Sequence, residues 1–424
     1  FAAIAAAGPL LGPVLAAQFG YMPGLLWILI GCVLAGGVHD MVVLFCSVRH
    51  RGRSLAYIAT QEIDRTTGFV ASWAVLAILI LTLAGLSIAV VNAMHNSLWS
   101  TYTVAATIPI AILMGLYMQI WRKGDVVGAT VIGVVLLFLC ILSGPWVAAH
   151  PEYFGWLDID RKAMSILIPI YGFFASVLPV WLLLLPRDYL STFLKIGTIG
   201  ALAIGIAFVM PNFQMPAFTD FIHGGGPIVG GPVIPFIFIT IACGAVSGFH
   251  SLVSSGTSSK AIANEKDMLP VGYGAMLCEC MLGVVALAIA CAAASNGVMA
   301  QGTPFPIFSA GISTFFTNIF GLPAGFSACF ITMCVSALGM TTIDSVARIG
   351  RMSFQEMIKP SDGVEASGAQ KFFMDKYVST ILTLIFAYGL CLAGYMNIWP
   401  LFGAANQLLS ALVLISLAVF LKMT

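Results

Sequence analysis

Fourteen residues near the middle of the chain hold its densest group of polar side chains. Between Ser247 and Lys260 the sequence SGFHSLVSSGTSSK contains seven hydroxyl groups, one imidazole and one lysine. Oxygen ligands suit a hard cation, and a histidine can exchange a proton near neutral pH. Each single hydroxyl is better explained by back-bonding to helix carbonyls and close helix packing. As a group, however, these residues predict a site for a coupling ion or proton.

Two carboxylates lie inside apolar segments, where contact with lipid would be costly. Asp40 follows His39 in the second apolar segment, and Glu279 lies in the ninth. Ionisable residues within membranes face protein or water and often mark ion or proton pathways. We therefore add both carboxylates to the candidate coupling group, with helix-helix contact as the structural alternative.

Other polar residues in or near apolar segments fit structural roles. Asp344 and Arg348 lie one helical turn apart and could form an ion pair. Arg187-Asp188 stands at a segment end, where a surface ion pair of little energetic value is expected. Asn406-Gln407 lies in the last segment, where two adjacent amides most simply hold helices together.

The first apolar segment contains two closely spaced prolines, in GPLLGP. A proline inside a helix removes an amide donor and clashes with the preceding turn. We therefore predict that the helix unwinds over Gly8–Pro13. Unwound backbone within a bilayer must be buried in protein or line a polar cavity, so this break predicts a substrate site.

Composition identifies a polytopic membrane protein and excludes several other classes of function. Hydrophobic residues make up 60% of the 424 residues, charged residues make up 8%, and the mean hydropathy is +1.02. A net charge of +1 with scattered basic residues argues against nucleic-acid binding. Cysteines lie mostly in apolar runs and lack zinc-ligand spacing, so we expect neither metal nor cofactor. Hydrolase, metalloprotease and nucleotide-binding motifs are absent from the sequence, and we expect no enzyme.

Apolar runs of about 20 residues predict twelve transmembrane segments. They are expected at 1–19, 23–47, 69–93, 103–120, 126–149, 164–185, 190–211, 232–252, 271–294, 322–342, 377–396 and 399–421. The more polar run 304–320 is placed outside, as an extracellular re-entrant or surface helix. Sixteen of the 18 basic residues then lie on one side. By the positive-inside rule that side is cytoplasmic, so the chain enters its first span from the cytoplasm.

The order of the segments predicts an internal repeat. The sixth segment is interrupted at Gly172, Pro179 and Pro186, and it runs opposite to the first. Two broken helices of opposite direction, five spans apart, fit a five-plus-five inverted repeat, although prolines at span ends produce the same pattern. The expected parts are a transporter core over 1–342 with repeats at about 1–149 and 164–342, a cytoplasmic loop over 343–376 and two additional transmembrane helices over 377–424. Ser54 is expected to cap a short interfacial helix that reaches Arg65.

Four blocks of the sequence look like one known family. They are AAIAAAGPLLGPVLAAQFGYMPG (2–24), LPVWLLLLPRDYLSTFLKIGT (178–198), FIFITIACGAVSGFHSLVSSGTSSK (236–260) and WPLFGAANQLL (399–409). In this order they resemble the carbon starvation protein A (CstA) family. The resemblance implies peptide uptake during carbon starvation, or proton-coupled pyruvate import as in related members, and a five-plus-five fold of the LeuT/APC type. Longer members carry extra material near 300–325 and further C-terminal helices, and we expect residues upstream of Phe1.

These features together predict a secondary transporter in the cytoplasmic membrane of a prokaryote. It would import peptides, with a proton preferred over sodium as coupling ion, and its partners would be substrate, ion and membrane lipid. The expected substrate-binding residues are Gly8, Pro9, Gly12, Pro13, Tyr171, Gly172, Ser176 and His250. The expected ion- or proton-coupling residues are Ser251, Ser254, Ser255, Thr257, Asp40 and Glu279.

Three other functions remain open at this point. A monocarboxylate importer for pyruvate would differ only in the volume of its pocket. A membrane sensor or scaffold would carry no substrate flux. An intramembrane hydrolase would need His250 bonded to a serine and oriented by a third group, for which Asp40 and Glu279 are the candidates.

Overall fold

The protein is helical throughout the part of the chain that the structure describes. The computed structural model describes residues 1–95, 97–295, 297–299, 304–321, 323–360 and 365–423. Within these ranges the one extended pairing is an isolated bridge between Ser295 and Val298. The prediction of an all-α protein is confirmed.

The first part of the chain forms helices that are joined by short turns. They are α1 (Gly8–Ala16), η1 (Ala17–Phe19), α2 (Tyr21–Gly31), η2 (Cys32–Gly36), α3 (Gly37–Arg49), α4 (Leu55–Glu62), α5 (Arg65–Met94), α6 (Leu98–Leu116), η3 (Tyr117–Trp121), α7 (Val126–Ala149), α8 (Pro151–Phe154), η4 (Gly155–Leu157) and α9 (Arg161–Val177). The α7 helix has the bounds predicted for the fifth span. Ser54 accepts a hydrogen bond from the Tyr57 amide at the start of α4, as expected for its N-cap.

The second part continues in the same way but contains one interrupted helix. Its elements are α10 (Leu184–Val209), η5 (Asp220–His223), α11 (Val233–Thr240), α12 (Gly248–Gly256), η6 (Ser258–Lys260), η7 (Glu265–Asp267), η8 (Pro270–Gly274), α13 (Ala275–Ala292), α14 (Pro304–Phe320), α15 (Ala324–Ile358), α16 (Gly368–Met374), α17 (Lys376–Cys391) and α18 (Tyr395–Met423). The predicted span 232–252 is divided, because residues 241–247 between α11 and α12 are not helical.

Seven helical segments of the described chain are long and apolar enough to cross a membrane. They are Tyr21–Arg49, Arg65–Met94, Leu98–Trp121, Val126–Ala149, Leu184–Val209, Glu265–Ala292 and Asn397–Lys422. Shorter apolar helices at Gly8–Phe19 and Lys376–Cys391 accompany them. The protein is therefore a multi-pass membrane protein, while twelve spans and an inverted repeat stay predictions.

The predicted unwinding over Gly8–Pro13 is wrong, because α1 begins at Gly8 and runs through both prolines. Pro9 stands in the first helical turn, where the missing amide has no helical partner to lose. Pro13 lies inside the helix and removes only one backbone bond. Non-helical backbone is found instead at residues 1–7, directly before α1.

Two further predicted boundaries change. The predicted sixth span is interrupted at Pro179, which lies in the turn between the end of α9 at Val177 and the start of α10 at Leu184, whereas Gly172 lies inside α9 and Pro186 lies inside α10. The predicted cytoplasmic loop over 343–376 is largely helical, because α15 continues to Ile358 and α16 follows. The run from 343 to 358 contains no proline, and its single glycine does not end the helix, which continues beyond its apolar part.

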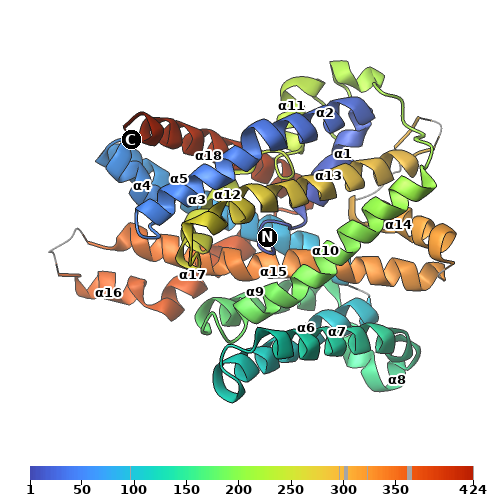
Figure 1. The fold of residues 1–424 in the computed structure, drawn as a ribbon, viewed down its shortest axis with the longest axis horizontal. Helices are drawn as coiled ribbons and strands as arrows, with labels where there is room; N and C mark the ends of the chain where they lie inside the picture. The colour runs from blue at the N-terminus through green and yellow to red at the C-terminus, as the bar shows by residue number, and fades with distance from the viewer. Residues whose placement is uncertain (96, 296, 300–303, 322, 361–364, 424) are drawn as a thin grey trace.

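The long helix α15 lies across the middle of the molecule (Figure 1). Helices α5, α6, α9, α10 and α17 pack against it, while α1 packs against α13. The short helix α12 lies between α3 and α18. The N-terminal residues reach the centre of the molecule, where Ala3 accepts a hydrogen bond from Thr342 of α15 at 3.2 Å.

Candidate functional site

The non-helical segment 241–247 comes unusually close to α1 and η2. A Cβ atom added to Gly12 would lie 2.5 Å from the carbonyl oxygen of Thr240, and one added to Gly8 would lie 2.6 Å from Cys243 Sγ. At Gly36 an added Cβ would lie 2.0 Å from the carbonyl oxygen of Ala245. Glycine therefore permits the backbone contacts that bring α1 and η2 against the interruption. Two of the predicted substrate-site glycines lie here.

Side chains of other helices satisfy the backbone of this interruption. The Asn406 amide on α18 donates to Ser247 Oγ at 3.1 Å and accepts from the Phe249 amide at 2.7 Å. Its neighbour Gln407 donates to the carbonyl of Val246 at 3.2 Å, and Trp27 Nε1 donates to the carbonyl of Ile241 at 3.0 Å. Buried backbone groups without such partners would be costly. The two amides thus hold α18 to the interruption, which agrees with the predicted structural role.

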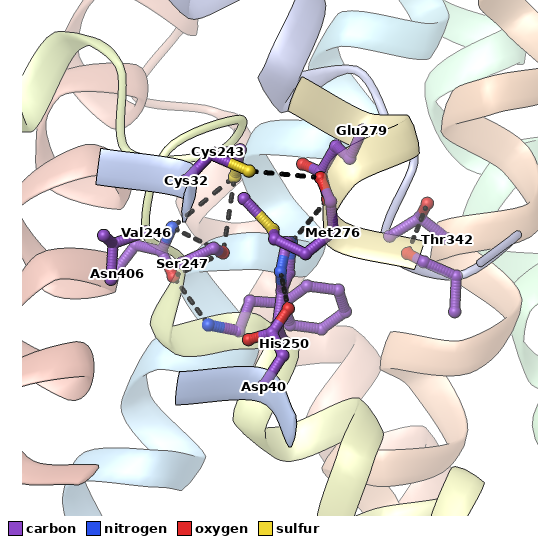
Figure 2. A network of polar contacts seen from close by, with 12 residues as sticks. Cys32, Asp40, Cys243, Val246, Ser247, His250, Met276, Glu279, Thr342 and Asn406 are labelled. Carbon is purple, nitrogen blue, oxygen red and sulfur yellow. Dashed lines mark hydrogen bonds and ion pairs between the residues drawn. The ribbon is translucent and has the colours of Figure 1, made fainter. Parts of the chain in front are cut away.

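His250 lies in the first turn of α12 between two carboxylates from other helices (Figure 2). Its Nδ1 atom is 2.8 Å from Asp40 Oδ2 on α3, and its Nε2 atom is 3.0 Å from Glu279 Oε2 on α13. His39 Nδ1 contacts the other oxygen of Asp40 at 2.8 Å. All four side chains are at most 2% exposed. The three predicted residues Asp40, His250 and Glu279 therefore form one buried network.

This geometry leaves polar atoms without hydrogen bonds at three residues of the network. Among the described residues, these atoms are both carboxylate oxygens of Glu279 and the Nε2 atoms of His39 and His250, so the 3.0 Å contact between His250 and Glu279 is an ion pair without hydrogen-bond geometry. Both ring nitrogens of His250 face carboxylates, so neither is directed at a serine. The arrangement can hold or pass a proton, and it does not provide the histidine-activated nucleophile that a hydrolase requires.

The hydroxyl groups of α12 bond to their own helix. Ser251 Oγ donates to the carbonyl of Gly248 at 2.6 Å, and Ser255 Oγ donates to the carbonyl of Ser251 at 2.7 Å. Ser254 is buried, and Thr257 caps the helix end with its backbone amide. These contacts match the structural interpretation of single hydroxyls. Among the described residues, no group of three histidine, cysteine or acidic side chains has the geometry of a metal site.

A second buried network joins α9, α10 and α15; it contains Tyr171, one of the predicted substrate residues, but the sequence did not indicate its contacts. Arg187 is 2% exposed, and its Nη1 atom donates to Asp344 Oδ2 at 2.8 Å and to the Tyr171 hydroxyl. Its Nε atom donates to Thr107 Oγ1 at 3.2 Å. The predicted surface pair of Arg187 with its neighbour in sequence is therefore wrong. Pairing of Asp344 with Arg348 is also absent, because the Arg348 guanidinium donates instead to backbone carbonyls at the end of α9.

Lys195 of α10 holds the non-helical start of the chain. It is 3% exposed, and its Nζ atom donates to the carbonyl of Ala2 and to Thr341 Oγ1, the latter at 2.8 Å. The ammonium group thus satisfies a carbonyl that has left helical hydrogen bonding. Lys195 is one of the sixteen basic residues that the positive-inside rule assigns to the cytoplasmic side, and the structure buries it. A lysine flanked by apolar residues on both sides was the available signal.

The remaining predicted substrate residues lie in helix contacts. Ser176 Oγ is 3.4 Å from the carbonyl of Ala347 and 3.3 Å from Thr380 Oγ1. Gly172 faces α15 and α17, where an added Cβ would contact Leu384. The structure therefore brings Gly8 and Gly12 together with the interruption, and it leaves Ser176 and Gly172 at the α9 interface.

Comparison with known proteins adds a consistent set of relatives. The family model described as "Carbon starvation protein CstA" matches residues 1–298 and 288–424. The chain is 40% identical over 455 residues to the "Peptide transporter CstA" of Bacillus subtilis (strain 168), covering 98% of this chain and 74% of that protein. It is 39% identical over 484 residues to the protein of the same name in Escherichia coli (strain K12), covering 99% and 68%. It is also 49% identical over 305 residues to the "Pyruvate/proton symporter BtsT" of Escherichia coli (strain K12), covering 72% and 42%.

Proposed function

Because the chain belongs to the carbon starvation protein CstA family, we propose that it is a secondary transporter that imports peptides across the cytoplasmic membrane of a prokaryote. Its relatives carry the names of transporters, and its own helices include seven that can cross a membrane. The proposed driving force is a proton gradient. The observation that carries the proton as coupling ion is the buried network of Asp40, His250 and Glu279.

The chemistry of this network favours a proton. One imidazole lies between two carboxylates that are both removed from water. Buried charges are tolerated when they are paired, and adding or removing one proton changes the charge balance of the whole network. The unpartnered Oε1 of Glu279 offers a further position for a proton. A step that moves one proton would therefore change the pairing across α3, α12 and α13.

The proposed substrate position lies where two helices begin beside non-helical backbone. Helix α1 starts at Gly8 after residues 1–7, and α12 starts at Gly248 after residues 241–247. Helix N-termini carry partial positive charge and attract carboxylates, as in transporters with broken helices. Cys243 of the interruption approaches Gly8 closely enough to fill the space of a side chain. A substrate carboxylate could therefore reach these N-termini only after the interruption moves away from Gly8, and it would then lie close to the His250 network.

Uptake into proteoliposomes tests this function. The proton and sodium gradients are imposed separately, and labelled dialanine is supplied outside. We expect accumulation with an inward proton gradient alone and none with sodium alone. Accumulation driven only by sodium would contradict the assignment of the coupling ion. A sensor or scaffold would give no substrate flux under any gradient. If the protein is a sensor or scaffold, a Ser254→Ala/Ser255→Ala double variant would also leave any uptake phenotype of cells unchanged.

Pyruvate is the second candidate substrate. The observation that favours it is the 49% identity to a relative named as a pyruvate/proton symporter. Pyruvate and a peptide both carry a carboxylate, so either would suit helix N-termini. Competition between labelled dialanine and unlabelled pyruvate decides between them: peptide accumulation that pyruvate does not reduce supports the first assignment. Pyruvate accumulation without any peptide uptake supports the second.

A further inference from the structure

A large cavity lies at the opposite end of α12 from the interruption. It has a volume of about 520 Å³ and is enclosed by the turn after α3, the start of α4, the C-terminal end of α12 and the last part of α15. This volume is typical of sites for small organic ligands. The charged residues of its wall are Arg51, Arg53, Lys260, Lys359 and Glu356. We call this space the basic cavity.

The walls of the basic cavity carry unbalanced positive charge. Four cationic side chains are present against one carboxylate, and within the described chain none of the four forms an ion pair within 4.0 Å. Burial lowers the pKa of Lys260, the nearby Glu356 carboxylate opposes this effect, and Arg53 adds to it. All three groups line the same cavity. A ligand that carries negative charge would balance the excess.

The turn that contains Arg51 and Arg53 has an uncommon backbone conformation that hydrogen bonds hold in place. Arg51 and Gly52 both adopt left-handed backbone conformations, with φ of 58° and 73°. Ser47 fixes this turn, because its carbonyl accepts from the Gly52 amide and its hydroxyl donates to the carbonyl of Arg53, both at 2.8 Å. A left-handed arginine is an uncommon arrangement that costs free energy. Here it carries one guanidinium into the cavity wall.

The basic cavity connects to the buried network through α12. Leu252, Ser255 and Gly256 of this helix line the cavity, and His250 lies in its first turn. At about 1.5 Å per residue, Ser255 is about 8 Å from His250 along the helix axis. One short helix therefore joins the proposed proton site to a basic cavity on the side that the positive-inside rule makes cytoplasmic.

We propose that the basic cavity is a second carboxylate-binding site, at which the transported substrate is held on the cytoplasmic side before release. Guanidinium and ammonium groups bind carboxylates through charge-assisted hydrogen bonds. The site rests on the proposed transport function, since its ligand is the substrate released from the proposed position beside α1. It also gives cytoplasmic substrate a place to bind and slow further import. The site is separate from the proposed substrate position beside α1.

Transport measured from the two faces tests the proposal. Arg51→Asn removes one charge and suits the left-handed backbone, because asparagine adopts it more readily than arginine. Combined with Lys260→Gln, it removes two charges from the cavity wall. In proteoliposomes of neutral lipid we expect the internal substrate concentration for half-maximal exchange to rise about tenfold, with the external KM within about twofold of the wild-type value. Ten-fold corresponds to about 1.4 kcal/mol of binding free energy.

Matched controls separate this site from general surface charge. Lys266→Gln/Lys371→Gln removes two exposed charges that lie outside the cavity wall, and it should change neither constant. The single variant Lys359→Gln provides a milder test if the double variant folds poorly. The probe is labelled dialanine, or labelled pyruvate if the wild-type protein carries pyruvate. The corresponding amide lacks the carboxylate, so its half-maximal concentrations should be the same for the variant and the wild-type protein.

Each other result overturns the proposal. Equal changes on both faces, or none, would mean that the cavity does not hold the released substrate. An effect that appears only with anionic lipid would mean that the cationic side chains of the cavity bind lipid headgroups. Competition by inorganic phosphate but not by internal substrate would mean that they bind phosphate. A wild-type protein that carries neither substrate would instead refute the proposed function itself.

Discussion

His250→Gln is the sharpest test of the buried network. In the wild-type protein the imidazole reaches Asp40 at 2.8 Å and Glu279 at 3.0 Å, with all three side chains removed from solvent. A glutamine at this position has a single amide group and cannot contact both carboxylates with the same geometry. At least one buried carboxylate would then lose its partner. Removing one member of a buried charge pair typically costs about 3–5 kcal/mol.

A double-mutant cycle makes this magnitude specific to the pair. Glu279→Gln removes the charge that His250→Gln leaves unpaired, so the double variant should be less destabilised than the sum of the single variants. We expect a coupling of about 0.5–3 kcal/mol, the range for contacts between residues of one network. For a chain of this length 1 kcal/mol corresponds to a change in Tm of about 1 °C. The single variant should therefore melt about 3–5 °C below wild type in detergent.

Transport separates the proton role from the structural role. Both single variants should lose accumulation driven by a proton gradient, and the double variant should retain substrate exchange without it. The matched control is His50→Gln, which removes an imidazole 2.9 Å from Glu62 at a partly exposed position. Such pairs contribute about 0–1 kcal/mol, so this variant should keep both Tm and accumulation. Additive losses of Tm, or wild-type accumulation by His250→Gln, would refute the assignment.

Three further predictions concern positions outside this network. Gly12→Ala should lower the free energy of unfolding by about 1–3 kcal/mol and reduce uptake, because its new Cβ would lie 2.5 Å from a backbone carbonyl oxygen. Gly389→Ala in α17 is the control and should be neutral or stabilising, because open space surrounds this position. Equal Tm values for the two variants would contradict the close approach. Lys195→Met should lower Tm because it releases Ala2, and Lys195→Arg should show a smaller decrease in Tm. Equal Tm values for Lys195→Met and the wild-type protein would mean that the ammonium group does not hold residues 1–7. A hydrogen bond from a first-turn amide of α7, together with one from a tyrosine hydroxyl, lowers the pKa of Asp125 below 3.8. The loss of Tm in Asp125→Asn should therefore be largest above pH 4 and shrink as the pH falls through the lowered pKa of the folded protein, and a difference independent of pH would disprove this contribution.

Sequence patterns predicted the helices well because apolar length is a local property. The fifth span and the cap of α4 at Ser54 were placed correctly, since an apolar run and a capping serine act within a few residues. The prolines were informative at only one of the two predicted breaks, because Pro179 lies in the turn between α9 and α10 whereas the prolines of α1 lie within a helix. Pro9 lies in the first turn of α1, where a proline is tolerated, so it marks the start of a helix and not a break. The actual interruption at 241–247 contains no proline, only Gly244 with a φ of 88°.

The buried networks depend on contacts that no local pattern contains. Asp40 and His250 are separated by 210 residues, and their pairing follows from the packing of α12 between α3 and α18. The free-energy cost of a polar or charged side chain in lipid can be recognised one residue at a time. For this reason Asp40, His250 and Glu279 were all candidates before their contacts were known. Arg187 was expected at the surface because it stands beside Asp188 at the end of an apolar segment. Its true partner, Asp344, lies 157 residues away.

The interruption before α12 explains why this short helix can serve two sites. A continuous helix from α11 would hold α12 by backbone bonds, whereas here its N-terminal end is held by the Asn406 side chain and by the close contact of Gly36 with Ala245. Its nine residues place His250 at the end near the buried carboxylates and Gly256 at the basic cavity. A change in the pairing of His250 would act on a helix that has no backbone hydrogen bonds to α11 across the interruption. In the proposed mechanism, that separation would let the proton step reach the basic cavity through α12 without first deforming the long helices α5 and α15.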